Sequence, residues 1–451
     1  MDPQATSVMW FRRDLRTFDN PALLAALAEG PTLGLFVLDP VLWDPAGPSR
    51  RHQLVASLRA LGADVPLAVR AGDPVREVVA AAREVGATHV HVAADYGPYG
   101  AARDEAVEEA LADAGIALVR TGSPYAVAPG RVRNGSGDPY QVFTPFSRAW
   151  SEHGWRGPAG PIPDDALWLS LEETAPLPEV DLPEGLDLPE PGEAAAHRAW
   201  EAFLEQVDDY AEDRDRPDLE GTSRLSHHLK LGEIHPRTLL ADLAGREGDG
   251  AATFRTELAW REFYADVLHR RPDSARDYLR PQLAAMRYDE PGPDFDAWRE
   301  GRTGFPIVDA GMRQLRATGW MHNRLRMITA SFLVKDLHVE WQHGARHFLH
   351  WLVDGDLASN SHGWQWTAGC GTDAAPYFRV FNPTTQGRRF DPDGVYIRTW
   401  VPELADVADP HDPSPDDRDL VGYPEPIVDH RAERLEALDR YGEVRDAAAG
   451  R

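Results

Sequence analysis

The first 130 residues alternate short apolar runs with amphipathic stretches, and this alternation constrains the fold more than any other feature of the sequence. The apolar runs are rich in Val, Leu and Ile, as buried strands are, and they cover residues 7–11, 33–38, 66–70, 88–93 and 116–120. Between them, Asn20-Pro21 and Asp73-Pro74 are typical helix starts. Strands that alternate with helices pair in parallel and are covered on both faces. We therefore expect a five-stranded, parallel, doubly wound α/β domain over residues 1–130.

The pattern changes after this domain. Residues 158–193 carry eight prolines and many acids with no periodicity, which predicts an interdomain linker over residues 131–193. From residue 194 onward, apolar residues recur at three- and four-residue spacing, as in amphipathic helices. The expected helices cover residues 195–210, 236–244, 251–269, 307–317, 320–338 and 344–353. The sequence thus predicts a larger all-helical domain over residues 194–451.

The net charge of −26 argues against a nucleic-acid partner only when it is taken as a bulk number. Nearly all of the net negative charge lies in two windows, residues 159–220 and 403–446. Between Ala310 and Lys335 there are five basic residues and no acid. A local positive field can oppose the global one, so a DNA-binding surface stays open.

Other features exclude whole classes of protein. Cys370 is the sole cysteine, so neither an internal disulfide nor a Cys-rich zinc site is expected. His343 and His347 have the spacing of zinc ligands, but Gly344 stands where the zinc motif has glutamate, and no metal is expected. The chain has neither a signal-peptide pattern nor a run of 18 apolar residues. We expect a monomeric, cytoplasmic protein without a membrane span.

Three segments combine residue types suited to ligand binding. Gly221–Ser226 packs three hydroxyls and an arginine into a few residues, which suits a phosphate group or a plain helix cap. Glu257, Trp260 and Tyr264 share one helical face, which suits either a pocket for a flat ligand or an interhelical polar contact. In the acid-free window, Asn323 and Met327 share a face, and a solvated basic face is the alternative there.

A fourth stretch suggests a site built from loops. Asp354, Asp356 and Asn360 precede Gly363-Trp364-Gln365-Trp366, and Pro376-Tyr377-Phe378-Arg379 follows. Hydrogen bonding to a ligand or to a buried arginine is favoured here over metal binding, because further carboxylates at ligand spacing are missing.

Taken in order, these segments resemble the photolyase/cryptochrome family of blue-light flavoproteins, most closely the class I enzymes that repair cyclobutane pyrimidine dimers. The resemblance runs from Trp10-Phe11-Arg12-Arg13-Asp14-Leu15-Arg16 to about Ala437, and its most specific motifs are Gly221–Ser226, Glu257–Tyr264, Trp320–Met327, Asp354–Trp366 and Gly371–Pro383. It implies an α/β antenna domain, a linker and a helical domain that holds FAD, in agreement with the patterns above.

The resemblance also implies a role for individual residues. Those expected to bind FAD are Tyr210, Thr222, Ser223, Arg224, Leu225, Ser226, Arg326, Phe348, Asp354, Asp356 and Asn360. Within this set, Arg326 is expected to pair with Asp354, and Asn360 to face N5 of the flavin. Residues 1–130 could carry an antenna chromophore, either a deazaflavin, a folate or a second flavin, or none.

The implied substrate is UV-damaged DNA, and the implied enzyme is a deoxyribodipyrimidine photo-lyase, a carbon–carbon lyase. The residues expected around the flipped dimer are Glu257, Asn323, Met327, Trp260 and Trp366, and those expected at the flanking phosphates are Arg214, Arg324 and Arg379. In this family, reduced anionic FAD donates an electron to the dimer under light, the ring opens and the electron returns.

Two features bear on the alternatives, a cryptochrome-like photoreceptor and a nucleotide-binding α/β protein without photochemistry. Enzymes for (6-4) photoproducts carry His where Asn323 stands, and cryptochromes usually continue into a tail, whereas this chain stops at Arg451; both points favour dimer repair.

The family reduces its flavin through three tryptophans. Trp364 and Trp341 match the inner two, but Tyr288 stands at the outer position, which predicts slower photoreduction or a detour through another aromatic residue.

Overall fold

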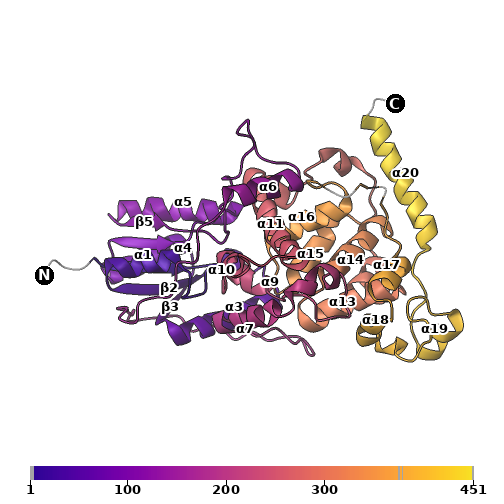
Figure 1. Ribbon diagram of the computed structural model, residues 1–451, viewed down its shortest axis with the longest axis horizontal. Helices are drawn as coiled ribbons and strands as arrows, with labels where there is room; N and C mark the ends of the chain where they lie inside the picture. Colours follow the sequence, from indigo (N-terminus) through magenta and orange to yellow (C-terminus); the bar gives the residue numbers. More distant parts are fainter. Residues whose placement is uncertain (1–4, 374–375, 378, 449–451) are drawn as a thin grey trace. The chain divides into compact units, whose positions relative to one another are not determined.

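Five parallel strands form the sheet at the start of the chain, as the alternation predicts. The computed structural model describes residues 5–373, 376–377 and 379–448. The strands are β1 (Ser7–Phe11), β2 (Thr32–Leu38), β3 (Leu67–Ala71), β4 (His89–Val92) and β5 (Ala117–Arg120). They pair in the order β3-β2-β1-β4-β5, and every pair is parallel. Strands β2, β3 and β5 of this sheet are labelled in Figure 1. The sequence of connections reverses beside β1, which places a topological switch point between β1 and β4.

Helices cover both faces of this sheet. They are α1 (Pro21–Glu29), α2 (Pro40–Trp43), α3 (Pro48–Asp64), α4 (Pro74–Glu84) and α5 (Pro98–Asp113). Val8 and Trp10 of β1 point into one hydrophobic core, and Met9 and Phe11 point into the other. Alternate residues of one strand thus feed two cores, as a doubly wound sheet requires.

The expected helix starts are confirmed by capping contacts. The side chain of Asn20 accepts a hydrogen bond of 3.2 Å from the Leu23 amide at the start of α1. Asp73 does the same for the Val75 amide, at 3.1 Å, at the start of α4. Both caps precede a proline in the first turn, where the missing N–H costs nothing.

The segment expected as a linker is more ordered than its composition indicates. It contains helix α6 (Phe143–His153), which the sequence pattern did not reveal. Beyond α6 the chain is irregular but bonded along the sheet: the Thr32 amide donates to the Leu167 carbonyl at 2.9 Å, and the Ala175 amide donates to the Val69 carbonyl at 2.7 Å. These backbone contacts fix the course of the proline-rich stretch.

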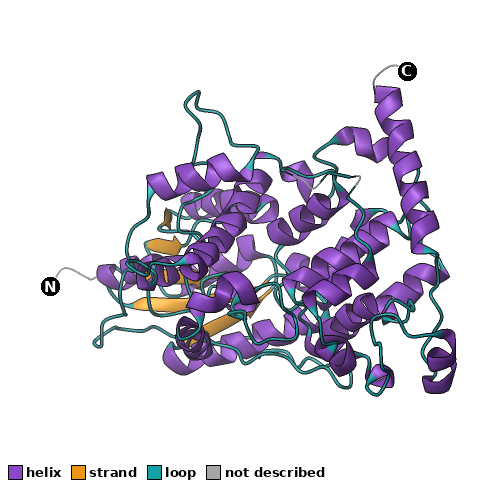
Figure 2. Cartoon of the chain, turned by 45° about the vertical axis from the view of Figure 1, so that its right-hand side comes forward, coloured by secondary structure: helices purple, strands orange, loops and turns teal. Residues whose placement is uncertain are grey.

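Outside the sheet, regular structure in the described part of the chain is helical (Figure 2). The remaining α-helices are α7 (Glu193–Leu204), α8 (Tyr210–Asp213), α9 (Ser226–Leu231), α10 (Pro236–Asp242), α11 (Asp249–Arg270), α12 (Pro293–Glu300), α13 (Pro306–Thr318), α14 (Asn323–Lys335), α15 (Trp341–Trp351), α16 (Leu357–Ala368), α17 (Pro383–Phe390), α18 (Val395–Trp400), α19 (Pro415–Val421) and α20 (His430–Ala448). The expected helix over residues 320–338 is shorter at both ends. It begins at Asn323 because the His322 ring caps it by accepting from the Arg324 amide at 3.1 Å.

The chain divides into two compact units. The first comprises the described residues up to Leu182, together with Pro189–Asp208 and Ser223–Pro272. The second comprises Pro183–Leu188, Asp209–Thr222 and the described residues from Asp273 onward. Helices α9 to α11 therefore belong to the same unit as the α/β domain. The domain boundaries expected from the sequence, at residues 130 and 193, stay predictions. None of the helices in the described ranges is long and apolar enough to cross a membrane.

Candidate functional site

The hydroxyl-rich motif forms a tight turn before α9. Arg224 has a φ of +53°, in the left-handed region that non-glycine residues adopt rarely. The side chain of Ser223 accepts from the Leu225 amide at 3.5 Å, and Ser226 is the first residue of α9. Such local strain is often found where a ligand is bound. Within the first unit, the turn brings the hydroxyls of Ser223 and Ser226 into one short segment, and the phosphate interpretation of the motif stays a prediction.

Within the first unit, the end of α9 is fixed to the loop that follows β1. The Leu15 amide donates to the Leu231 carbonyl at 3.2 Å, and Arg16 donates from its guanidinium to the Gly232 carbonyl at 3.0 Å. Gly232 has a φ of +70°, and a Cβ there would lie 2.0 Å from the Arg13 carbonyl oxygen. Only glycine allows this approach.

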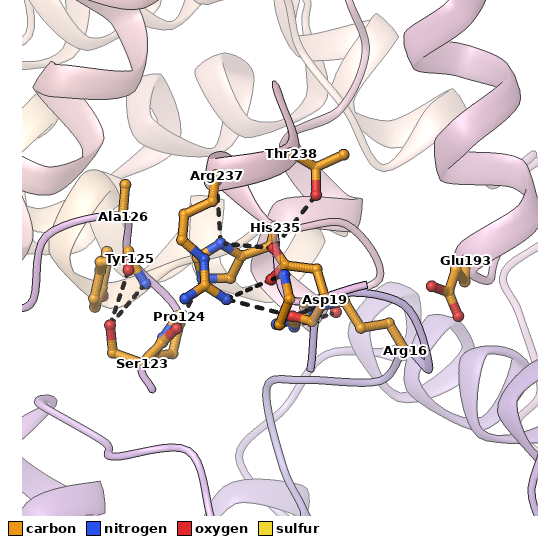
Figure 3. A network of polar contacts seen from close by, with 12 residues as sticks. Arg16, Asp19, Ser123, Pro124, Tyr125, Ala126, Glu193, His235, Arg237 and Thr238 are labelled. Carbon is orange, nitrogen blue, oxygen red and sulfur yellow. Dashed lines mark hydrogen bonds and ion pairs between the residues drawn. The ribbon is translucent and has the colours of Figure 1, made fainter. Parts of the chain in front are cut away.

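A buried polar network holds the same loop (Figure 3). Arg16 donates to the Asp19 carbonyl at 2.6 Å, and Arg237 donates to the Asp19 carboxylate at 2.7 Å. His235 accepts from the Arg237 amide on Nδ1 at 3.1 Å and donates from Nε2 to the Ser123 carbonyl at 2.8 Å. Burial and the nearby Arg16 and Arg237 charges hold the pKa of His235 well below its usual range, so the ring is neutral. Arg16 belongs to the sequence motif Trp10–Arg16, but its part in this network could be seen only in the structure.

One face of α11 carries the residues expected to meet the dimer. Trp260 stacks on Phe143 of α6 with ring centroids 3.6 Å apart and an interplanar angle of 6°. Tyr264 lies 5.3 Å from Trp260, and Glu257 on the same face is half-buried. The sequence predicts this shared face, but it did not predict the stacking partner Phe143.

Another face of α11 binds the chain between residues 126 and 132, and sequence reasoning missed it. Glu262 accepts from the backbone amides of Ala126 and Val127 and from the Trp150 indole. One turn further, Asp266 accepts from the Gly130 amide at 2.7 Å and from Arg270 at 2.8 Å. The regular spacing of Glu262, Asp266 and Arg270 was the available signal. Burial raises the pKa of Glu262 to about 7, against the effect of its three hydrogen bonds.

In the second unit, Arg326 and Asp354 form the expected ion pair. Two guanidinium nitrogens donate to the two carboxylate oxygens, at 3.2 and 2.7 Å, and Arg326 Nε donates to the Met321 carbonyl at 2.8 Å. The Asp354 side chain is only 3% exposed. A buried carboxylate needs such a partner, and the fork fixes its orientation.

Helix α16 orders two more of the residues expected at FAD. Asp356 caps the helix by accepting from the Ser359 amide at 3.0 Å. Asn360, one turn later, donates from Nδ2 to the Ala345 carbonyl of α15 at 3.1 Å. Phe348 of α15 is buried in the hydrophobic core of the second unit, together with Ala345 and Trp364. The second unit therefore holds Asn360 in a defined orientation, as a hydrogen-bonding role requires.

Two of the three expected DNA-contacting arginines meet at one carboxylate. Asp215 lies 2.5 Å from Arg324 and 3.9 Å from Arg214. Arg324 also lies over the Phe390 ring, 4.3 Å from its centroid. The side chain of Arg379 is exposed, and its carbonyl accepts from Lys335 at 3.0 Å.

The remaining expected residues of the second unit are placed as follows. Asn323 is exposed at the start of α14, while Met327 and Trp366 are half-buried. Trp364 and Trp341 are buried, and Tyr288 is half-buried. In the Gly371–Pro383 motif, residues 374, 375 and 378 lie outside the described residues. Glu257 and Trp260 belong to the first unit. Among the described residues, no group of three or more His, Cys, Asp or Glu side chains is arranged to hold a metal ion.

Comparisons with known proteins show the family of this chain. A family model described as DNA photolyase matches residues 7–164, and one described as the FAD binding domain of DNA photolyase matches residues 254–443. A deoxyribodipyrimidine photo-lyase of Halobacterium salinarum is 41% identical, over 97% of this chain and 99% of its own length. The chain belongs to the DNA photolyase family.

Solved structures in this family are similar throughout. A bacterial class III photolyase from Agrobacterium tumefaciens has a TM-score of 0.90 and 35% identity, and the match covers 99% of both chains. An archaeal photolyase from Sulfolobus tokodaii with two FAD molecules has a TM-score of 0.83 and 29% identity, over 97% of this chain and 100% of that one. The fold expected from the sequence is confirmed by both.

The residues present fit FAD, the cofactor of this family's helical domain. The match to the FAD binding domain contains the Arg326–Asp354 pair, Phe348, Asp356 and Asn360. The hydroxyls near Arg224 offer donors of the kind that diphosphates accept. A fixed ion pair, an amide and an aromatic side chain suit a polar, planar ring system.

Proposed function

We propose that this chain repairs UV-damaged DNA in a light-dependent reaction that splits cyclobutane pyrimidine dimers. The observation that carries the proposal is its 41% identity, over nearly the whole of both chains, to a protein named deoxyribodipyrimidine photo-lyase. The site geometry supports it, because the residues that such an enzyme needs for FAD and for DNA are present and ordered within their units.

For the cofactor, we assign the phosphates to the turn at Thr222–Ser226 and the ring system to Arg326, Asp354, Asp356 and Asn360. When bound, reduced FAD supplies the light-driven electron that opens the dimer. The chain's own contribution is orientation and electrostatics. The guanidinium of Arg326 balances the buried Asp354 charge, and Asn360 is held by α15.

For the substrate, we assign the binding of a flipped dimer to two sets of residues. Glu257 and Trp260 come from α11, and Asn323, Met327 and Trp366 come from α14 and α16. Extruding a damaged base step costs less than extruding normal bases, and aromatic rings then replace the lost stacking. The stack of Trp260 on Phe143 keeps the indole rigid for that purpose.

For the DNA backbone, we assign phosphate contacts to Arg214, Arg324 and Arg379. Phosphate contacts place the duplex without reading its sequence, as a repair enzyme for any dimer requires. Most of the −26 net charge lies in the windows 159–220 and 403–446, and five basic residues with no acid lie between Ala310 and Lys335. DNA affinity should therefore fall steeply as salt rises.

An antenna chromophore in the α/β domain is a separate proposal. Along α3, the side chains of Ser49, Gln53 and Ser57 recur every four residues, and each has a buried polar atom without a partner in the described chain. The Nε atom of Arg50 is also buried without a hydrogen-bond partner among the described residues. Orphaned donors on one buried face suit a polar heterocycle, whether deazaflavin, folate or flavin. The Sulfolobus tokodaii photolyase holds two FAD molecules, which carries the implication of a novel light-harvesting cofactor in that protein. The absorption spectrum of the purified protein tests this.

The repair proposal is tested with a short oligonucleotide that contains one thymine dimer. The chemically reduced protein is illuminated with it, and recovery of intact thymines is followed by chromatography. A dark sample and a Glu257→Ala variant are the controls. Light-dependent recovery is expected for the native protein. If a flavin-loaded protein gives none, the photoreceptor alternative replaces repair. The monomeric state and the cytoplasmic location remain predictions.

A further inference from the structure

The buried indole N–H of Trp341 has no hydrogen-bond acceptor in the described part of the chain to which it could release a proton. The Trp341 side chain is 1% exposed. The buried indole N–H of Trp364 likewise has no hydrogen-bond acceptor among the described residues. An indole that has lost an electron is acidic, but it needs an acceptor to release its proton. Trp341 therefore stays a radical cation after oxidation and keeps its full power to oxidise a neighbour.

Tyr278 is the neighbouring residue that can donate an electron to oxidised Trp341. Its ring lies 6.1 Å from the Trp341 ring in an edge-to-face contact, and its hydroxyl donates to Glu340 Oε1 at 2.9 Å. Phenols lose a proton when they lose an electron, so a carboxylate at hydrogen-bond distance assists the step. Burial, Tyr288 and Glu340 hold the pKa of Tyr278 well above its usual range, so the resting residue is a protonated phenol.

Tyr288, the residue expected at the outer position, lacks this advantage. Its ring lies 6.4 Å from that of Tyr278, but its hydroxyl donates to the backbone carbonyl of Leu283 at 3.1 Å. An amide carbonyl is a far weaker base than a carboxylate. Tyr278 is also 8% exposed, which protects a radical from solvent, whereas the half-buried Glu340 can pass a proton on to water.

We propose that Tyr278, with Glu340 as its proton acceptor, is the residue that re-reduces Trp341 during photoreduction of the flavin. The oxidant is the excited, oxidised flavin, acting through Trp364 and Trp341. One electron moves from Tyr278 to the Trp341 radical cation, which becomes neutral tryptophan. The phenolic proton moves along the hydrogen bond to Glu340. The products are a neutral tyrosyl radical and a protonated carboxyl group, so charge and atoms balance.

Flash absorption on the flavin-loaded protein, without DNA, tests the proposal. In the native protein we expect the tryptophan radical cation to decay as the tyrosyl band appears, with a slower rate in D2O than in H2O. Tyr278→Phe should abolish the tyrosyl band and the solvent isotope effect, leaving fast recombination of the tryptophan radical. Glu340→Gln, which keeps a hydrogen-bond acceptor but removes the base, should slow the step strongly.

Tyr288→Phe is the matched control, because it removes the same hydroxyl from the adjacent ring. It should leave the tyrosyl band and the isotope effect intact. An unchanged tyrosyl band in Tyr278→Phe, or its loss in Tyr288→Phe, would overturn the proposal. Flavin absorbance and circular dichroism confirm that each variant is folded and loaded. This inference rests on the proposed function only for the flavin: dimer repair by chemically reduced protein is assayed separately, so either idea can fail without the other.

Discussion

The carboxylate of Asp215 lies 2.5 Å from a guanidinium nitrogen of Arg324. It also lies 3.9 Å from Nε of Arg214, so two arginines expected at DNA phosphates share one acid. A carboxylate at this position occupies a place that a phosphate oxygen would take. Bound DNA must therefore displace Asp215 from Arg324 or bind beside the pair.

Replacing Asp215 with Asn should strengthen binding to undamaged duplex DNA. The change removes the competing charge from a partly exposed pair worth about 1 kcal/mol, so affinity should rise about fivefold at low salt. The preference for damaged DNA should fall, because the gain does not depend on the lesion. Fluorescence anisotropy over a salt series measures both effects. Asp409→Asn is the control: it removes the same charge from Arg388, 2.6 Å away in an exposed pair, which has no assigned DNA role. An equal effect in that variant would mean that only bulk charge matters.

Replacing Arg326 with Ala should release FAD and destabilise the protein. It leaves Asp354 buried and without its partner, which typically costs about 3 kcal/mol. We expect a severalfold lower flavin content after purification and a lower unfolding temperature. Arg302→Ala is the matched control, because its pair with Glu300 is exposed and should contribute less than about 1 kcal/mol. Full flavin retention in Arg326→Ala would contradict the assigned role.

The apolar periodicity carries most of the architecture, because it records which faces are buried. It places all five strands within a residue or two and most of the long helices. It misses α6, whose neighbours are prolines and polar residues. Contacts between distant segments are beyond such reasoning. The amides that bind Glu262 belong to Ala126 and Val127, 136 and 135 residues away, and backbone donors leave no mark on a sequence.

The candidate site shows the same division. The Arg326–Asp354 pair spans 28 residues and was expected only through a family resemblance. Conversely, Arg324 of the acid-free window was visible in the sequence, but its partner Asp215 was not, since Asp215 lies 109 residues away in the acidic window 159–220. Local chemistry can be predicted from local residues, whereas the partner that tunes it depends on tertiary packing.

Replacing Lys335 with Met should weaken DNA binding through Arg379. Lys335 donates from Nζ to the Arg379 carbonyl at 3.0 Å and lies 5.1 Å from the centroid of the Tyr377 ring, and burial lowers its pKa to about 7. Methionine keeps most of the buried volume but cannot donate this hydrogen bond. We expect about a tenfold loss of DNA affinity if Arg379 supplies about 1.4 kcal/mol, with flavin content unchanged. In an Arg379→Ala background the same change should cost little more. Equal losses in both backgrounds would show that Lys335 acts elsewhere.

The pH dependence of stability should report on Glu262. Its pKa is raised by burial from 4.5 to about 7, so the native state keeps this proton to higher pH than the unfolded chain does. The stability that Glu262 contributes is therefore present below pH 4.5 and is lost as the pH rises to about 7, a total of about 3 kcal/mol. Glu262→Gln should remove this slope, measured by urea unfolding between pH 4.5 and 8. Its amide offers one oxygen to three donors, so the variant should be about 1–2 kcal/mol less stable than native at pH 5, where both side chains are neutral. The gap should narrow as the pH rises toward 7, and parallel curves for the two proteins would contradict this account.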